Sequence, residues 1–456
     1  MSALAADTQH PAAADRPLDS RTVVATWLPL AASWLLMGLE LPLVSAVMAR
    51  LPQATVSLAA YGGVVFPCAL LIESPIIMLL AASTAVCRDR PAYALVQRFM
   101  FVAAGSLTLL HALVAFTPLF DVVAGTLLGV PPETREPARL GLRLMLPWTL
   151  AIAYRRTQQG VLIRFRRPHA VTIGTAIRLA MNCAVLGIGA RHGGLPGIAV
   201  GASAVACGVV AEAIYAGWAV RAVVAREMPV IAAGSPLTLR AFLHFYLPLS
   251  ATPLIGFLAM PLSAAGMSRM PLALESLAIW PVLSGVTFTL RSLGFAFNEV
   301  VVSQLDHRFA VRTLRRFAVV LSAASSGVLL LAAATPLGVL WFGRVSALPA
   351  DLAGLAARAL WIMVPLPALA VWQSWWQGTL VHSRRTRGVT ESVVVLLAAT
   401  VFPLAIGVAF HAAPGILFAA AAFTLGNGAQ AAWLARRSRR EIARLEARDA
   451  LAGGQP

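Results

Sequence analysis

The sequence predicts an all-α membrane protein with twelve transmembrane helices in two pseudo-symmetric six-helix bundles. Three observations support this prediction: an apolar composition, a duplicated half, and arginines concentrated in alternate loops. Of the 456 residues, 59% are hydrophobic and only 12% are charged, and the mean hydropathy is +0.78. A soluble globule needs more polar surface than this chain offers. We therefore expect a protein held in a lipid bilayer, with about 20 apolar residues in each span.

The second observation is that the chain repeats itself after about 219 residues. The stretch from Thr26 to Tyr61 matches the stretch that begins at Tyr246, and a later set of matches follows at an offset of about 218. Matching pairs include Leu28/Leu247, Pro42/Pro261, Arg50/Arg269, Pro52/Pro271, Thr117/Thr335, Gln159/Gln377 and Gly160/Gly378. Solenoid repeats are about 20 to 50 residues long, so a period of this length indicates two complete lobes.

These boundaries predict five segments. We expect a disordered cytosolic tail over 1–21, an N-terminal six-helix lobe over 22–221, a cytoplasmic linker over 222–239, a C-terminal six-helix lobe over 240–436 and a basic cytosolic tail over 437–456. The first segment is rich in Ala, Asp and Pro and has no basic region ahead of an apolar core, so it does not read as a signal peptide.

The third observation is the position of the charge. All 36 basic residues are arginine, and the formal net charge is +17. One set of loops and the C-terminal tail hold Arg88–Arg98, Arg164–Arg167, Arg221–Arg240, Arg308–Arg316, Arg384–Arg387 and Arg436–Arg448. The other set holds Arg50, Arg135, Arg139, Arg191, Arg269, Arg344 and Arg358. Positively charged loops stay in the cytoplasm, so we expect a protein of the bacterial inner membrane with both termini on the cytoplasmic side. The position of the charge also argues against a nucleic-acid partner.

The sequence contains no recognisable enzyme motif. The four cysteines form no CxxC pair, the histidines are isolated, and there is no HExxH, Walker A or dinucleotide-binding glycine pattern. We therefore predict no enzyme activity, no catalytic residues, no cofactor and no metal site, and ATP-driven transport is unsupported.

The first and seventh spans contain prolines at matching positions. Pro29 and Pro42 lie in the first span, and Pro248, Pro253 and Pro261 lie in the seventh. Proline removes a backbone donor and clashes with the preceding turn, so both helices should bend there. The bends suit either a gate or a purely structural packing role.

Two acids lie within the first two spans. A carboxyl group at membrane depth is costly and normally faces a partner, water or a proton. Glu40 and Glu73 correspond to Ala259 and Ser292 in the second copy, so the shared architecture does not require them. We predict that they couple transport to a proton or a sodium ion, and the alternative is a structural ion pair.

Arginines also lie within spans. Arg155 and Arg156 precede Gln159 in the fourth span, and consecutive helical residues diverge by about 100°, so at least one arginine should face the interior. A fixed guanidinium can hold a carboxylate or a phosphate with two hydrogen bonds. The predicted substrate-binding residues are Arg155, Arg156, Gln159, Arg178, Arg291 and Gln377. Two alternatives stay open: both arginines of the pair reach out to the headgroups, or buried glutamates neutralise the arginines.

Taken together, these motifs resemble the multidrug, oligosaccharidyl-lipid and polysaccharide (MOP) exporter superfamily. The resemblance rests on the two six-helix copies, the proline-broken first and seventh helices, the repeated Thr-Pro and the repeated Gln-Gly. Over 98–190, the run HALVAFTPLFDVVAGTLLG and the turn RRPHAVTIG are similar to the progressive ankylosis protein family, which exports polyanions. The resemblance implies a MATE-like V shape, alternating access to a central cavity, and an ion-coupling acid at the position of Glu40.

The predicted function is a secondary active exporter of small organic or phosphate-containing anions. A proton- or sodium-coupled exporter of lipophilic cations and a flippase for a lipid-linked glycan are the alternative transport functions. A non-transporting scaffold is the remaining alternative, although buried charges are expensive to keep without a use.

Overall fold

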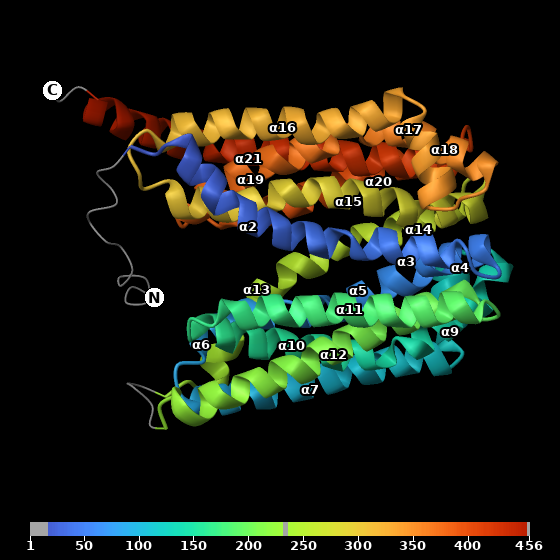
Figure 1. Ribbon diagram of the computed structural model, residues 1–456, viewed down its shortest axis with the longest axis horizontal. Coiled ribbons are helices and arrows are strands. Elements are labelled where there is room, and N and C mark those ends of the chain that lie inside the picture. The colour runs from blue at the N-terminus through green and yellow to red at the C-terminus, as the bar shows by residue number, and fades with distance from the viewer. Residues whose placement is uncertain (1–16, 231–235, 454–456) are drawn as a thin grey trace.

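The chain folds into two stacked layers of helices (Figure 1). The computed structural model describes residues 17–230 and 236–453. In this part of the chain, ten helical segments are long and apolar enough to cross a membrane, and the one β feature is an isolated bridge between Pro17 and Arg308. The all-α membrane class is confirmed.

The N-terminal half supplies most of one layer. Its helices are α2 (Ser20–Gly38), α3 (Glu40–Met48), α4 (Ala54–Ala60), α5 (Phe66–Glu73), α6 (Leu79–Val86), α7 (Arg90–Phe116), α8 (Leu119–Asp121), α9 (Pro132–Leu144), α10 (Leu146–Arg164), α11 (Pro168–His192) and α12 (Gly197–Arg226). Shorter elements are the π-helices η1 (Tyr61–Val65) and η3 (Val122–Leu127) and the 3₁₀ turn η2 (Ser74–Ile76).

The C-terminal half repeats this order. Its elements are α13 (Leu239–Phe257), α14 (Ala259–Ser268), α15 (Ala273–Gln304), α16 (Ala310–Ala334), α17 (Leu337–Leu340), the π-helix η4 (Trp341–Val345), α18 (Ala350–Met363), α19 (Leu366–His382), α20 (Arg387–Phe410) and α21 (Gly415–Gly453). The spans α9–α10 and α21 carry more charge than the ten apolar segments, and they complete six spans in each half.

The backbone carries the repeat in detail. The π-helices η3 and η4 begin at Val122 and Trp341, which are 219 residues apart. Residues in the left-handed region recur at the two offsets found in the sequence, 219 for Gln53 with Leu272 and 218 for Gly129 with Ala347, Arg166 with Arg384 and Gly193 with His411. Because left-handed backbone is costly for residues other than glycine, such matches point to one inherited chain path.

The first span breaks where proline predicts it. Leu39 separates α2 from α3, three residues before Pro42, and Leu258 separates α13 from α14 at the equivalent place. Pro42 cannot donate to the carbonyl of Gly38, and this oxygen instead accepts a hydrogen bond of 2.9 Å from Thr289 Oγ1 on α15. A side chain of the opposite half therefore satisfies the carbonyl that the break frees.

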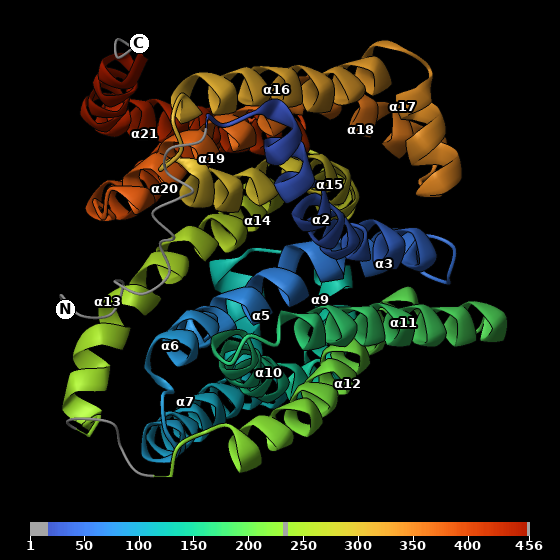
Figure 2. The ribbon, with the colours of Figure 1, turned by 60° about the vertical axis from the view of Figure 1, so that its left-hand side comes forward.

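Helices α2 and α13 each pack against the opposite half. Trp27 Nε1 on α2 donates to the carbonyl of Leu293 on α15 at 3.0 Å. Tyr246 on α13 donates to the carbonyl of Pro75 at 2.6 Å and packs against Phe99 of α7. Figure 2 shows α13 running across the space between the two layers. The sequence did not predict this exchange.

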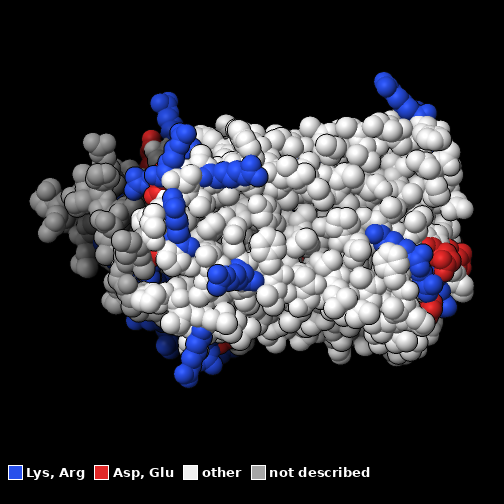
Figure 3. Space-filling view, turned by 90° about the horizontal axis from the view of Figure 1, so that it is seen from below, with Lys and Arg blue, Asp and Glu red and all other residues white. Residues whose placement is uncertain are grey.

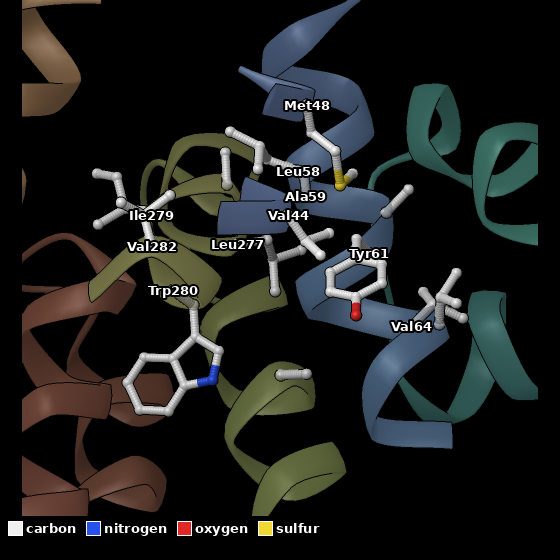
Figure 4. Close-up of a cluster of buried hydrophobic side chains, with 14 of the residues drawn as sticks. Val44, Met48, Leu58, Ala59, Tyr61, Val64, Leu277, Ile279, Trp280 and Val282 are labelled. Carbon is white, nitrogen blue, oxygen red and sulfur yellow. The ribbon is translucent and has the colours of Figure 1, made fainter. Parts of the chain in front are cut away.

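Away from α2 and α13, the halves meet around η1 and the start of α15. Gly62 and Gly63 lie so close to α15 that an added Cβ would stand 2.5 Å from Pro281 and 3.0 Å from Leu277. Apolar side chains from both halves surround this contact (Figure 4). Lipid gives no hydrophobic drive for helix association, so small residues that allow close packing are what hold such a contact together.

Charges on the surface fit a membrane-spanning orientation. Figure 3 shows arginines gathered at both ends of one face, with a broad uncharged belt between them. Helix α2 begins, and α21 ends, at the same end of the molecule (Figure 1). The π-helices η3 and η4 lie near the opposite end.

Some predicted segments fall at the limits of the described chain. Residues 1–16 of the predicted N-terminal tail and residues 231–235 of the predicted linker lie outside the described residues. Within the described part, α12 continues five residues into the predicted linker, and α21 runs as one helix through the predicted basic tail to Gly453.

The repeat predicts a stabilising substitution at Ala347, which has φ of 54° where its counterpart Gly129 has 66°. Ala347→Gly should remove left-handed strain of about 1–2 kcal/mol and add about 0.5–1 kcal/mol of chain entropy cost, for a net gain below about 1.5 kcal/mol. Thermal unfolding of the purified protein in detergent measures this gain. Ala357→Gly in helix α18 is the control and should lower the midpoint of thermal unfolding. A lower midpoint for both variants would contradict left-handed strain at Ala347.

Candidate functional site

A buried carboxylate joins three helices of the N-terminal half. Glu212 on α12 is completely buried. Its Oε2 accepts a hydrogen bond of 2.8 Å from Arg155 Nη1 on α10 and lies 3.5 Å from Arg178 Nε on α11. Its Oε1 accepts from Gln159 Nε2 at 2.9 Å. These four groups form a charge-assisted network that hydrocarbon alone could not accommodate.

A second carboxylate connects this network to the broken first span. Glu40, the first residue of α3, places Oε2 at 3.3 Å from Arg178 Nη1. Its Oε1 accepts a hydrogen bond of 2.6 Å from Asn182 Nδ2, one turn further along α11. The Glu40 side chain is 17% exposed whereas the Glu212 side chain is fully buried. Arg178 therefore bridges one enclosed acid and one partly accessible acid.

Glycines make room for this network. A Cβ added at Gly208 of α12 would stand 1.8 Å from Asn182 Oδ1, so only glycine lets this amide lie against α12. A Cβ at Gly160 would stand 2.3 Å from the carbonyl of Leu80, and one at Gly378, its counterpart, 2.7 Å from Val301. The repeated Gln-Gly thus has a packing reason: the glycine brings α10 onto α6 and α19 onto α15.

Glu73 and Arg156 lie outside these hydrogen bonds. Glu73 is 2% exposed, and its Oε2 has no hydrogen-bond partner in the described part of the chain. The Nε of Arg156 is likewise buried and unpartnered there, and no carboxylate oxygen within the described residues lies within 4 Å of this side chain. Glu73 and Arg156 therefore form no ion pair with each other.

The C-terminal half holds a different arrangement. Arg291 on α15 donates from Nη2 to Asn427 Oδ1 of α21 at 2.8 Å, and its guanidinium lies 4.9 Å from the ring centre of Phe423. Gln373, which corresponds to Arg155, donates to the carbonyl of Asn427 at 2.8 Å. Arg291 therefore has an amide and aromatic rings as neighbours, whereas Arg155 and Arg178 have carboxylates.

The structure brings together four of the eight predicted site residues: Glu40, Arg155, Gln159 and Arg178. Arg291 lies with Asn427 in the other half, and Gln377 makes no side-chain hydrogen bond to the described residues. For Arg155, the alternative of a side chain reaching the headgroups is wrong. Glu212 and Asn182 are absent from the predicted site residues. The other alternative, that buried glutamates neutralise the arginines, holds for Arg155 and Arg178, which pair with Glu212 and Glu40.

The fold of this chain is similar to that of several solved membrane transporters. An inward-facing multidrug resistance MATE family transporter of the MOP superfamily matches 93% of this chain and 99% of its own, at 15% identity and a TM-score of 0.70. An outward-facing MATE family transporter of the same superfamily matches 94% of this chain and 96% of its own, at 14% identity and a TM-score of 0.61. The lipid II flippase MurJ in an inward closed conformation matches 92% of this chain and 91% of its own, at 13% identity and a TM-score of 0.66. No protein-family model matches the sequence, and neither does any curated protein.

The chain has the fold of the MOP-superfamily transporters. Identities of 13–15% over nearly the whole length establish the fold and leave substrate and coupling to the residues themselves. The comparisons give no support to the narrower resemblance to the progressive ankylosis protein family.

The network predicts a large cost for removing its central charge. Glu212→Gln leaves Arg155 and Arg178 facing a neutral amide, and breaking such a buried pair costs about 3–5 kcal/mol. The free energy of unfolding, from denaturant titration of the detergent-solubilised protein, measures this cost. Glu391→Gln is the matched control, because Glu391 pairs with Arg387 and Arg437 near the surface and should cost about 1 kcal/mol or less. Equal losses in the two variants would contradict a special role for Glu212.

Proposed function

We propose that this protein is a secondary active transporter that exports small organic or phosphate-containing anions by alternating access. The observation that carries the proposal is the buried Glu40–Arg178–Glu212–Arg155 network inside a transporter fold. Charged groups at membrane depth generally mark ion or substrate pathways. The arginine distribution supports a bacterial inner-membrane protein with both termini in the cytoplasm, so the end with η3 and η4 is the outer end.

Glu40 is the proposed coupling residue. It is the more accessible acid of the network, and it holds Arg178 and Asn182 against α3. A proton or a sodium ion on this carboxylate weakens both contacts, because Arg178 keeps only Glu212 as its acid partner. Helix α3 is then released from α11 next to the break at Leu39. Ion binding to Glu40 would thereby change the bend in the first span.

Arginines without acid partners are the proposed substrate contacts. Arg156 on α10 and Arg291 on α15 come from opposite halves, and neither lies within 4 Å of a carboxylate in the described residues. Release of Arg178 by ion binding would add a third guanidinium. This arrangement makes anion binding stronger when Glu40 has taken up a cation, which links the two events.

Transport into proteoliposomes tests this proposal. Arg156→Gln and Arg291→Gln should each lower the uptake of citrate or pyrophosphate by about tenfold, the equivalent of about 1.4 kcal/mol of lost charge-assisted binding. Arg191→Gln, at an exposed arginine outside the network, is the control and should leave uptake unchanged. If citrate, pyrophosphate and nucleotide all fail to be transported by the intact protein, the anion substrate is wrong.

A lipophilic-cation exporter is the second candidate. The buried Oε2 of Glu73 has no hydrogen-bond partner in the described residues, so this carboxylate is available to a cation. Expression in a pump-deficient host would then raise drug resistance, and Glu73→Gln would abolish the increase. Protection that survives Glu73→Gln excludes this carboxylate as the cation site.

Two repeat-related arginines join the halves at the proposed outer end. Arg269, just after α14, donates to the carbonyls of Thr126, Leu127 and Leu128 at the end of η3, at 2.9–3.1 Å. Arg50, just after α3, donates to the carbonyl of Arg344 in η4 at 2.7 Å. We call these contacts the outer latch.

The two arginines of the outer latch also make the same contact within their own helices. The Nη1 of each arginine also donates to a carbonyl of its own helix, Ala46 for Arg50 and Ala265 for Arg269, at 2.6 and 2.7 Å. A guanidinium has five donors in a fixed fork, so it can hold its own helix and the opposite half together. The higher TM-score with the inward-facing relative supports an outer end that is closed here.

The outer latch predicts a change in accessibility at Leu277, a buried residue of α15 that packs on Gly63 of the opposite half. In a chain without its natural cysteines, Leu277→Cys should resist a membrane-impermeant thiol reagent. Adding Arg50→Gln and Arg269→Gln removes the cross-half hydrogen bonds and should raise the labelling rate about tenfold or more. Arg358→Gln on α18 is the control; unchanged labelling in the double variant contradicts the latch.

A further inference from the structure

We propose that two repeat-related grooves at the arginine-rich end bind the headgroups of anionic phospholipids. This inference concerns the lipid-facing surface, and it holds whether or not the proposed transport function is correct. It rests on the shape of the grooves, on unpaired arginines beside exposed apolar side chains, and on the recurrence of both features in the two halves.

The first groove lies between the start of α16 and the end of α21 and has a volume of about 490 Å³. Arg312, Arg315 and Arg316 line one side, together with Phe309 and Val319. Residues three and four apart share one face of a helix, so Arg312 lies over both Arg315 and Arg316. The groove therefore presents three guanidinium groups from a single turn.

The positive charges of these arginines are not neutralised by acids among the described residues. None of Arg312, Arg315 and Arg316 forms an ion pair or a side-chain hydrogen bond with the described residues. Asp449, across the groove, is already bound by Arg448 at 2.9 Å. Glu446 is the one other acid in the lining, so the groove keeps an excess of positive charge. A phosphate group is the natural complement of such a cluster.

An apolar surface continues directly from the charged one. Val319 and Val320, in the next turn of α16, are 53% and 65% exposed. At about 1.5 Å per residue, they lie roughly 4.5–6 Å beyond Arg316 along the helix axis. A ligand that fits both surfaces has an anionic head and a hydrocarbon chain. A free phosphate or nucleotide would use the arginines and leave the apolar part unfilled.

A second groove, with a volume of about 570 Å³, lies on α7, the counterpart of α16, and its other side is formed by Leu239 of α13. Its lining includes Arg98, Phe99 and Val102. Arg98 is the counterpart of Arg316, and Val102, 70% exposed, is the counterpart of Val320. Arg98 also lacks a side-chain partner among the described residues. With one arginine in place of three, this groove should bind the same lipids more weakly.

Native mass spectrometry of the full-length protein in detergent tests the proposal with phosphatidylglycerol as the probe. The protein should retain up to two phosphatidylglycerol molecules and no phosphatidylcholine, and neither inorganic phosphate nor glycerol 3-phosphate should displace them. Each arginine lost should weaken binding about fivefold. Thus R312Q/R315Q/R316Q should nearly abolish the stronger site, and R98Q should weaken the other.

Controls separate a lipid site from loss of folding. Arg312, Arg315 and Arg316 all changed to Lys keep the charge and should keep most of the binding, whereas Arg191→Gln and Arg358→Gln, outside both grooves, should change nothing. Equal retention of phosphatidylcholine overturns the proposal, as does displacement by inorganic phosphate, which would mark a plain anion site. So does an equal loss in the two control variants.

Discussion

Hydrocarbon cannot solvate an ion, so a charge within a span is costly unless other helices bring it a partner or it faces water. Glu212 shows how far this constraint reaches. Its carboxylate accepts from Arg155 and Gln159 of α10 and lies beside Arg178 of α11. Three spans are therefore fixed in register by one side chain, and Glu40 extends the same network to the broken first span.

The two halves show which features belong to the frame and which to the site. The breaks at Leu39 and Leu258, the paired π-helices and the left-handed residues recur in both, because they set the chain path. The charges of the buried network do not recur: Gln373 stands in place of Arg155, and Ala259 in place of Glu40. A duplicated frame thus carries one ionic network and one arrangement of amides and aromatic rings, and this asymmetry is why we propose ion coupling in the N-terminal half.

The sequence predicted the frame better than the contacts, for physical reasons. Proline position and the repeat offset are local signals, so the break before Pro42 and its copy before Pro261 could be foreseen. The pairing of Arg155 with Glu212 spans 57 positions, and that of Asn182 with Glu40 spans 142. Such pairs depend on helix rotation and on close approach at glycines such as Gly208, which no single stretch of sequence specifies. The packing of α2 on α15 is equally non-local.

In the proposed mechanism, helix α3 provides the physical connection between ion binding at Glu40 and the outer latch. Glu40 is its first residue, and Arg50 follows its end about 15 Å away, at 1.5 Å per residue. Loosening Glu40 from Arg178 frees one end of a short rigid helix whose other end is held by a carbonyl of the opposite half. Helix α14 has Ala259 and Arg269 at these positions, so it can latch but cannot sense an ion. On the proposed mechanism, only the contact at Arg50 is therefore tied to the coupling acid, and a single cation on Glu40 would bias which face of the protein opens.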